Sequence, residues 1–158
     1  MTDELGYRPC VGVMLVNREG RVFVGRRIDN KEGDWWQMPQ GGVDPGEDER
    51  DAAMRELGEE TGISEDFIQF IAKCEEPQRY DLPEELQGKL WNGKYKGQEQ
   101  MWFLARFTGE DEHIDLDAHD PPEFCDYKWV QPHQLPDMIV PFKKRVYRAL
   151  VEEFAELI

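Results

Sequence analysis

The stretch that decides the fold runs from Gly41 to Ile63 and reads GGVDPGEDERDAAMRELGEETGI. Its beginning is rich in Gly, and it continues from Glu47 to Thr61 as a segment of helix-forming residues without proline. Gly62 follows at the position where helices commonly end on a left-handed residue. The stretch therefore predicts a Gly-rich loop over 33–46 that leads into a helix over Glu47–Thr61.

Three glutamates of this helix, Glu56, Glu59 and Glu60, are three and four positions apart and share one face. Their carboxylates repel one another, and a divalent cation relieves that repulsion most simply. Oxygen ligands favour hard ions such as Mg²⁺ or Mn²⁺. Arg55 precedes Glu59 by four positions and can orient a carboxylate through a fork-shaped ion pair. A solvated acidic face is the alternative, but the ordered Gly, Arg and apolar positions favour the metal site.

The rest of the chain alternates apolar segments with turn residues. The segment 75–96 is predicted as loop because Pro77 and Pro83 interrupt it. A second helix is predicted from Pro141 to the end, with one apolar stripe made of Phe142, Val146, Leu150, Phe154 and Leu157. This order predicts an α/β (α+β) fold, with a mixed sheet sandwiched between helices and a single domain over residues 1–158. The predicted strands cover 10–16, 21–26, 67–74, 98–107 and 127–130. A turn at Asn17–Gly20 is predicted to join the first two as a hairpin.

The composition restricts the possible partners. The chain has 34 acidic and 19 basic residues, a net charge of −15, which disfavours binding along a nucleic acid but allows a small basic pocket for one phosphorylated end. The three Cys are far apart, which disfavours disulfides and a thiolate zinc site. No signal peptide is evident, and the longest apolar run, 11–16, is too short to cross a bilayer. We therefore expect a cytoplasmic protein without a membrane partner.

The Gly41–Ile63 stretch resembles the Nudix box and is complete at every defining position. The resemblance implies that water attacks a phosphorus within the phosphate chain of a nucleotide, with Mg²⁺ as cofactor and Mn²⁺ or another divalent ion as a substitute. It implies metal ligands at Glu56, Glu59 and Glu60 and in the loop at Gly41. Arg55 belongs to the catalytic set, and the candidates for the general base are Glu59, Glu60 and Glu123.

Motifs outside the box resemble the Nudix branch of bacterial RNA pyrophosphohydrolases and dinucleoside polyphosphate hydrolases. By this resemblance Arg8, Arg27 and Lys143 bind phosphate oxygens, Phe142 stacks on a base and Gln98 hydrogen-bonds near the reacting phosphates. A fourth metal ligand, if it is not the base, is Glu123. The alternatives are surface roles for the two arginines, a solvated helix face for Lys143 and a core role for Phe142. The motifs are Gly6–Pro9, Trp36–Gly42, Gly97–Phe103, Pro122–Phe124 and Phe142–Tyr147.

The substrate stays open between two phosphorylated compounds. Glu99 and Met101 stand where the branch often has Lys, which predicts no extended nucleic-acid track, and 80–83 with 91–98 resemble diadenosine tetraphosphate hydrolases. We therefore expect a pyrophosphohydrolase of dinucleoside polyphosphates that also acts on the 5′-triphosphate end of RNA. The alternatives are an enzyme acting primarily on RNA to initiate mRNA decay, an inactive nucleotide-sensing module, and an acidic partner-binding protein. Tyr80 and Trp91 are left as either stacking platforms or core residues.

Overall fold

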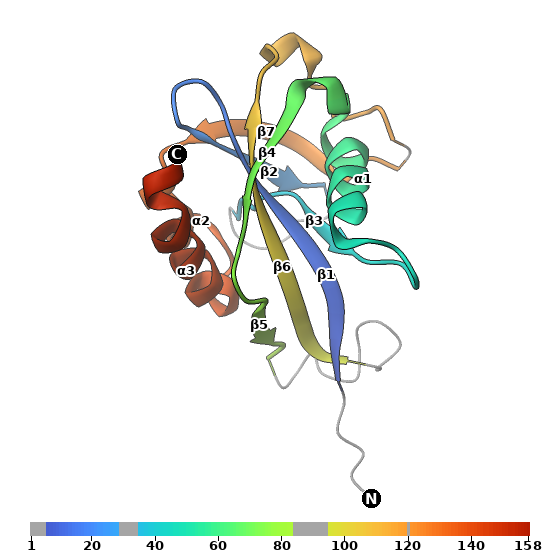
Figure 1. Ribbon diagram of the computed structural model, residues 1–158, viewed down its shortest axis with the longest axis vertical. Coiled ribbons are helices and arrows are strands. Elements are labelled where there is room, and N and C mark those ends of the chain that lie inside the picture. Colours follow the sequence, from blue (N-terminus) through green and yellow to red (C-terminus); the bar gives the residue numbers. More distant parts are fainter. Residues whose placement is uncertain (1–5, 29–34, 84–94, 120) are drawn as a thin grey trace, which may run out of the picture.

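The computed structural model describes residues 6–28, 35–83, 95–119 and 121–158. Figure 1 shows a central sheet with α1 on one side and α2 and α3 on the other, so the predicted sheet between helices is confirmed. The strands are β1 (Gly6–Val16), β2 (Val22–Arg27), β3 (Gln40–Gly42), β4 (Ile68–Lys73), β5 (Gln78–Asp81), β6 (Tyr95–Phe107) and β7 (Phe124–Val130). The helices are α1 (Glu49–Thr61), α2 (Leu135–Met138) and α3 (Lys144–Phe154).

The sheet is mixed and is built on the two longest strands. β1 and β6 run parallel, and the strand order is β4-β6-β1-β2-β7, with β3 paired to β1 and β5 paired to β6. The other pairings are antiparallel. Because helices cover both faces, the central strand β1 is buried continuously from Cys10 to Val16, which explains its unbroken apolar run. Gly12 leaves the space that the Trp102 ring occupies.

The predicted turn after β1 is present and joins it to β2 as a hairpin. The side-chain oxygen of Asn17 accepts hydrogen bonds from the backbone N–H groups of Glu19 and Arg21, each at 3.0 Å. Gly20 has a φ of 77°, which an L-residue rarely adopts. The turn therefore depends on an Asn side chain and a Gly backbone, the two features that made it recognisable in the sequence.

Helix α1 begins two residues later than predicted because Asp48 caps it. The Asp48 carboxylate accepts hydrogen bonds from the backbone N–H groups of Arg50 and Asp51 at 3.0 and 3.3 Å. The helix ends as predicted at Gly62, whose φ is 70°. The caps fix both ends of the helix relative to the sheet. The side chains that it buries are those of Ala52, Ala53, Leu57, Glu60 and Thr61.

Several short elements were not predicted. β3 and β5 lie inside segments predicted as loops, and α2 inside a segment left unassigned. The three and four residues of these strands carry no apolar pattern, and hydrogen bonds to β1 and β6 hold them. β6 and β7 begin three residues earlier than predicted for the same reason.

At the C-terminus, Pro141–Lys143 forms a 3₁₀ turn before α3. The buried stripe of Val146, Leu150 and Phe154 is confirmed, whereas Leu157 is 46% exposed, in a second 3₁₀ turn beyond the helix. None of the helices in the described part of the chain has the length and apolar character that a bilayer crossing requires.

Candidate active site

Arg55 ties the Gly-rich loop to helix α1. Its Nε and Nη2 donate to the two carboxylate oxygens of Glu47, each at 2.9 Å, and Nη2 also donates to the carbonyl of Gly42 at 3.0 Å. On the other side, Nη1 donates to Glu56 Oε1 at 2.9 Å and to Glu59 Oε2 at 3.5 Å. The fork-shaped contact therefore goes to Glu47 rather than to Glu59, the partner that the spacing predicted. The Arg55 hydrogen bonds lower the pKa of Glu47 to about 2.

The most buried carboxylate of the site is that of Glu60, which is 2% exposed. Its Oε1 accepts a hydrogen bond from the backbone N–H of Gln40 at 3.4 Å, while its Oε2 is buried without a partner among the described residues. Burial raises its pKa well above the ordinary 4.5, and the charges of Glu56 and Glu123 raise it further. The ionised form of this carboxylate is therefore disfavoured by its surroundings, and a bound cation would stabilise it.

Glu56 lies against the loop at Gly41. A Cβ atom at Gly41 would collide with the Glu56 carboxylate, so glycine is needed here for space rather than for backbone conformation. Burial also raises the pKa of Glu56, and Glu59 and Glu123 contribute in the same direction. The predicted Gly41 position thus lies directly beside one of the predicted metal ligands.

Glu123, which lies far from the box in the sequence, is brought to it by the pairing of β2 with β7. Arg27 at the end of β2 forms an ion pair with Glu123, with 3.2 Å between Nη1 and Oε1, and both side chains are 42% exposed. The backbone N–H of Ile28 donates to the Glu123 carbonyl at 3.0 Å. Since its charge acts on Glu56 and Glu60, Glu123 lies within electrostatic reach of the box.

The residues predicted to bind substrate gather around Tyr80. The ring of Phe142 lies 5.5 Å from the Tyr80 ring, and the Lys143 ammonium lies 5.2 Å from it. Burial raises the pKa of the Tyr80 hydroxyl, and the positive charges of Arg8 and Arg27 act on it in the opposite direction. Tyr80 is 4% exposed, so it is a core residue that supports these side chains. Trp91, the other aromatic residue whose role the sequence left unassigned, lies outside the described residues.

Lys143 is a half-buried cation in this group. Burial lowers its pKa to about 8, and the nearby positive charge of Arg27 lowers it as well. Phe142 is half-buried too, and its edge packs on the core rather than being enclosed by it. A basic cluster, consisting of Arg8, Arg27 and Lys143, therefore exists on a strongly acidic chain.

A row of three glutamines, Gln40, Gln98 and Gln100, lies beside the basic cluster. Gln98 and Gln100 are buried, and only Gln98 was a predicted site residue. Gln100 donates from Nε2 to Oε1 of Gln98 at 2.7 Å and to Oε1 of Gln40 at 3.0 Å. Its own Oε1 accepts from the indole N–H of Trp102 at 2.9 Å. Gln98, Gln100 and Trp102 alternate along β6, so the sequence signal was three polar or amphipathic residues on one face of a strand.

The donor set suits a hard divalent cation in its chemistry. It offers the carboxylates of Glu56, Glu59, Glu60 and Glu123, two of which have raised pKa values and one of which has a buried oxygen without a partner. Among the described residues, however, no three carboxylate, thiol or imidazole side chains are gathered closely enough to hold a metal ion as they stand. Arg55 holds the oxygens of Glu56 and Glu59 instead. The ligand set is thus a prediction that the chemistry of the residues supports.

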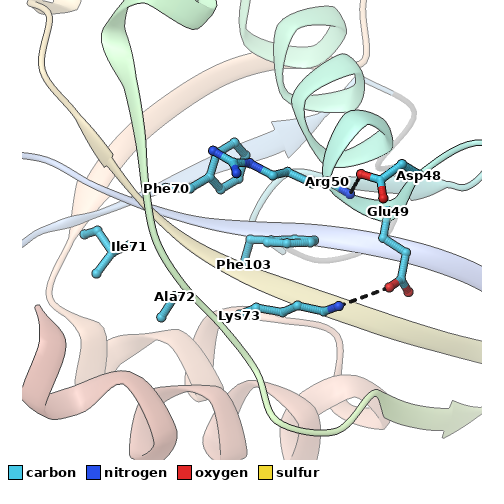
Figure 2. A pocket seen from close by; sticks show the side chains of 8 residues that line it. All are labelled: Asp48, Glu49, Arg50, Phe70, Ile71, Ala72, Lys73 and Phe103. Carbon is cyan, nitrogen blue, oxygen red and sulfur yellow. Dashed lines mark hydrogen bonds and ion pairs between the residues drawn. The ribbon is translucent and has the colours of Figure 1, made fainter.

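A separate pocket of about 460 Å³ lies between the start of α1 and strand β4, and Figure 2 shows its lining. Its charges are satisfied internally. Glu49 pairs with Lys73 at 3.4 Å, and the Arg50 guanidinium lies 4.7 Å from the centre of the Phe70 ring. None of the residues predicted to bind metal or substrate lines this pocket. We therefore place the candidate active site at the box and the basic cluster.

Comparisons with known proteins identify the family. A family model of the NUDIX domain matches residues 6–150. An RNA pyrophosphohydrolase of Erythrobacter litoralis (strain HTCC2594) is 64% identical over 156 residues, 99% of this chain and 95% of that protein. Another, from Roseobacter denitrificans (strain ATCC 33942 / OCh 114), is 53% identical over 150 residues, 95% of this chain and 92% of that protein.

Solved structures show the same fold at lower identity. The E. coli dihydroneopterin triphosphate pyrophosphohydrolase has a TM-score of 0.71 and 23% identity, covering 93% of this chain and 96% of its own. A C. elegans Ap4A hydrolase binary complex has a TM-score of 0.68 and 21% identity, covering 94% of this chain and 98% of its own. The fold, the box and the close relatives lead to one assignment: the chain belongs to the Nudix hydrolase family.

Proposed function

We propose that the chain is a Mg²⁺-dependent pyrophosphohydrolase that removes pyrophosphate from the 5′-triphosphate end of RNA. The observation that carries the proposal is the basic cluster of Arg8, Arg27 and Lys143 beside the carboxylates of the box, on a chain of net charge −15. Such a cluster selects one phosphorylated end rather than a length of nucleic acid. Relatives that are more than half identical over nearly the whole chain are named RNA pyrophosphohydrolase. We also propose one domain over 1–158 and a cytoplasmic location.

The carboxylates divide between holding the cation and taking a proton. Nudix hydrolases generally require divalent metal ions, and Glu56, Glu59 and Glu60 would hold the ion here. A bound Mg²⁺ would offset charge on the phosphate chain and lower the pKa of the attacking water. Glu59, Glu60 and Glu123 remain the candidates for the base that accepts the proton of that water. Arg55 keeps two of the carboxylates oriented towards the loop.

The basic cluster and Phe142 would bind the substrate itself. Arg8, Arg27 and Lys143 supply positive charge for the phosphate oxygens. The site would thus be locally basic although the chain as a whole is acidic. Phe142, half-buried against Tyr80, exposes the remainder of its ring to a base of the first nucleotide. In this role the ring adds affinity without strong selection among bases.

A dinucleoside polyphosphate is the second candidate substrate. It presents a similar chain of phosphates, and β6 offers no Lys at positions 99 and 101, where a longer nucleic acid would gain contacts. Glu99 forms an ion pair with Arg79 at 3.3 Å, which neutralises a cation near the strand. This favours a short substrate.

A side-by-side assay separates the two substrates. The protein with Mg²⁺ is given diadenosine tetraphosphate or a short 5′-triphosphorylated RNA at the same low salt, and kcat/KM is compared. A ratio of about ten or more in favour of RNA supports the proposal, and the reverse ratio supports the dinucleotide. With three cations contacting phosphate, the salt dependence of RNA affinity should have a log–log slope of about −2.

Turnover of neither substrate would contradict the enzyme proposal. Calorimetric binding of the same two compounds would then test the nucleotide-sensing alternative. Glu59→Gln serves as the control in both arms, because it removes a charged ligand of the proposed site and leaves the helix length and the Arg55–Glu47 contact unchanged.

A further inference from the structure

The hydrogen bonds of the glutamine row, Gln40, Gln98 and Gln100, have only one consistent orientation. The indole N–H of Trp102 is a donor without acceptor capacity, and it lies 2.9 Å from Gln100 Oε1. If the Gln100 amide were reversed, its NH₂ group would face the indole N–H, and two buried donors would oppose each other. Trp102 cannot turn away easily, because it is fully buried with its ring packed on Tyr147 at 5.9 Å.

The orientation of the Gln100 amide determines the orientation of the other two glutamine amides. Both hydrogens of the Gln100 NH₂ are used, one towards Gln98 Oε1 at 2.7 Å and one towards Gln40 Oε1 at 3.0 Å. Gln98 and Gln40 therefore accept on the side that faces Gln100, and each directs its own NH₂ group away from it. No hydrogen bond within the described residues takes up either NH₂ group.

Both of these NH₂ groups lie beside the basic cluster. Gln98 is in register with Arg8 on β1 and with Tyr80 on β5, so its side chain stands between theirs on the same face of the sheet. Gln40 precedes Gly42 by two on β3, and a Cβ atom at Gly42 would collide with the Arg8 guanidinium. The two amides thus line the surface that the proposed function gives to the phosphate chain.

We propose that Trp102 and Gln100 are positioning residues that hold Gln98 and Gln40 as hydrogen-bond donors towards the substrate. Phosphate oxygens only accept hydrogen bonds, so a surface with a fixed donor orientation favours them over a ligand that offers N–H or O–H groups. Neither Trp102 nor Gln100 reaches the substrate in this arrangement, and both act through their neighbours. The inference rests on the proposed function and deepens it.

A comparison of mutants in two backgrounds tests the arrangement. Gln100→Leu should lower kcat/KM for 5′-triphosphorylated RNA on the order of ten-fold, the size of losing a hydrogen bond to a charged group. Trp102→Phe keeps an aromatic ring at this position but removes the fixed N–H donor, and it should act in the same direction to a smaller extent. In a Gln40→Leu/Gln98→Leu background, either change should have no further effect, because the residues through which it acts are gone.

The controls distinguish positioning from a purely structural role. Gln69→Leu, at an exposed position of edge strand β4, should leave kcat/KM unchanged. A loss from Gln100→Leu that persists in the Gln40→Leu/Gln98→Leu background would overturn the proposal. So would a lower Tm with unchanged kcat/KM. If Gln100→Leu fails to fold, Trp102→Phe carries the same comparison.

A binding readout keeps this test separate from the proposed function. Calorimetry with inorganic triphosphate and no divalent ion should show the same non-additive pattern in Kd. If the wild-type protein hydrolyses neither substrate but the Kd pattern holds, the proposed function fails and the donor arrangement stands. If turnover is normal and the variants are additive in both readouts, only the donor arrangement fails.

Discussion

The Arg55 guanidinium holds both carboxylate oxygens of Glu47, eight positions earlier, through parallel hydrogen bonds of 2.9 Å. Because Glu47 precedes the helix cap at Asp48, this contact fixes the loop in front of α1 against the side of the helix. The same guanidinium reaches Glu56 and Glu59, so one side chain links the loop to two carboxylates of the box.

Arg55→Lys should therefore lower kcat about a hundred-fold or more while the chain still folds. A lysine ammonium keeps the charge but cannot form the planar bidentate contact and the Glu56 contact together. The measurement is kcat at saturating substrate, with Tm recorded in parallel. Arg50→Lys is the matched control, since Arg50 lies on the same helix and packs on Phe70. Near-normal kcat for Arg55→Lys would remove Arg55 from the catalytic set.

Glu60→Gln should abolish most turnover and stabilise the metal-free protein. The Glu60 carboxylate is 2% exposed, so an uncharged side chain of the same shape avoids the cost of burying the charge. We expect Tm of the variant to exceed that of the wild type by roughly 5 °C at pH 8 in EDTA. A lower Tm would contradict the interpretation that the buried charge of Glu60 destabilises the metal-free protein.

The Tm difference between Glu60→Gln and wild type should depend on pH with a defined sign. The folded-state pKa of Glu60 is raised above 4.5, so its contribution to wild-type stability is fully present below about pH 4.5 and is lost as the pH rises towards the folded pKa. The advantage of the variant should therefore grow with pH and then level off. Scans from pH 5.5 upwards avoid the isoelectric region near 4.6. Addition of Mg²⁺ should reduce the difference.

Gly41→Ala should lower kcat by at least ten-fold because its Cβ would displace the Glu56 carboxylate. The backbone at Gly41 has ordinary φ, so the effect is steric and local. Gly6→Ala is the control, since no atom lies within 4 Å of a Cβ placed there. Kinetics of both variants in Mg²⁺ decide the point. Wild-type kcat for Gly41→Ala would show that Glu56 tolerates displacement.

Phe142→Ala should raise KM about ten-fold, the size expected for one stacked base, with a modest change in Tm. The ring is half-buried at the edge of the core, next to Tyr80. Phe154→Ala removes a ring that is 1% exposed and should cost about 3–5 kcal/mol of stability with KM unchanged. A large loss of Tm with unchanged KM for Phe142→Ala would identify it as a core residue.

The sequence predicted the elements whose information is local. The apolar run of β1, the Asn17–Gly20 turn and the helix ending at Gly62 each follow from neighbouring residues. β3 and β5 did not, because their few residues are strands only through pairing with β1 and β6. The same distinction applies to the site. The spacing of the glutamates on α1 gave their shared face, but only the β2–β7 pairing brings Glu123 to them.

Arg55 and the glutamine row show most clearly what a sequence pattern cannot predict. Helical spacing pointed to Glu59 as the partner of Arg55, whereas Glu47 in the preceding loop makes the stronger contact. A one-dimensional pattern lists neighbours along a helix and omits a loop that folds back on it. Gln98 was predicted by resemblance, and the donors that orient it became visible only with side-chain positions.

Lys143→Arg should remove the basic limb of the pH profile near pH 8. Burial and Arg27 lower the pKa of Lys143 to about 8, so the ammonium loses its charge as the pH rises through that value, and affinity for the phosphate chain falls. Arginine stays charged over the whole range, so kcat/KM of the variant should stay level from pH 7 to 9 where the wild type declines. Lys144→Arg, whose parent lysine pairs with Asp137 at 3.2 Å, should keep the wild-type limb. An unchanged limb in Lys143→Arg would mean that another group titrates there.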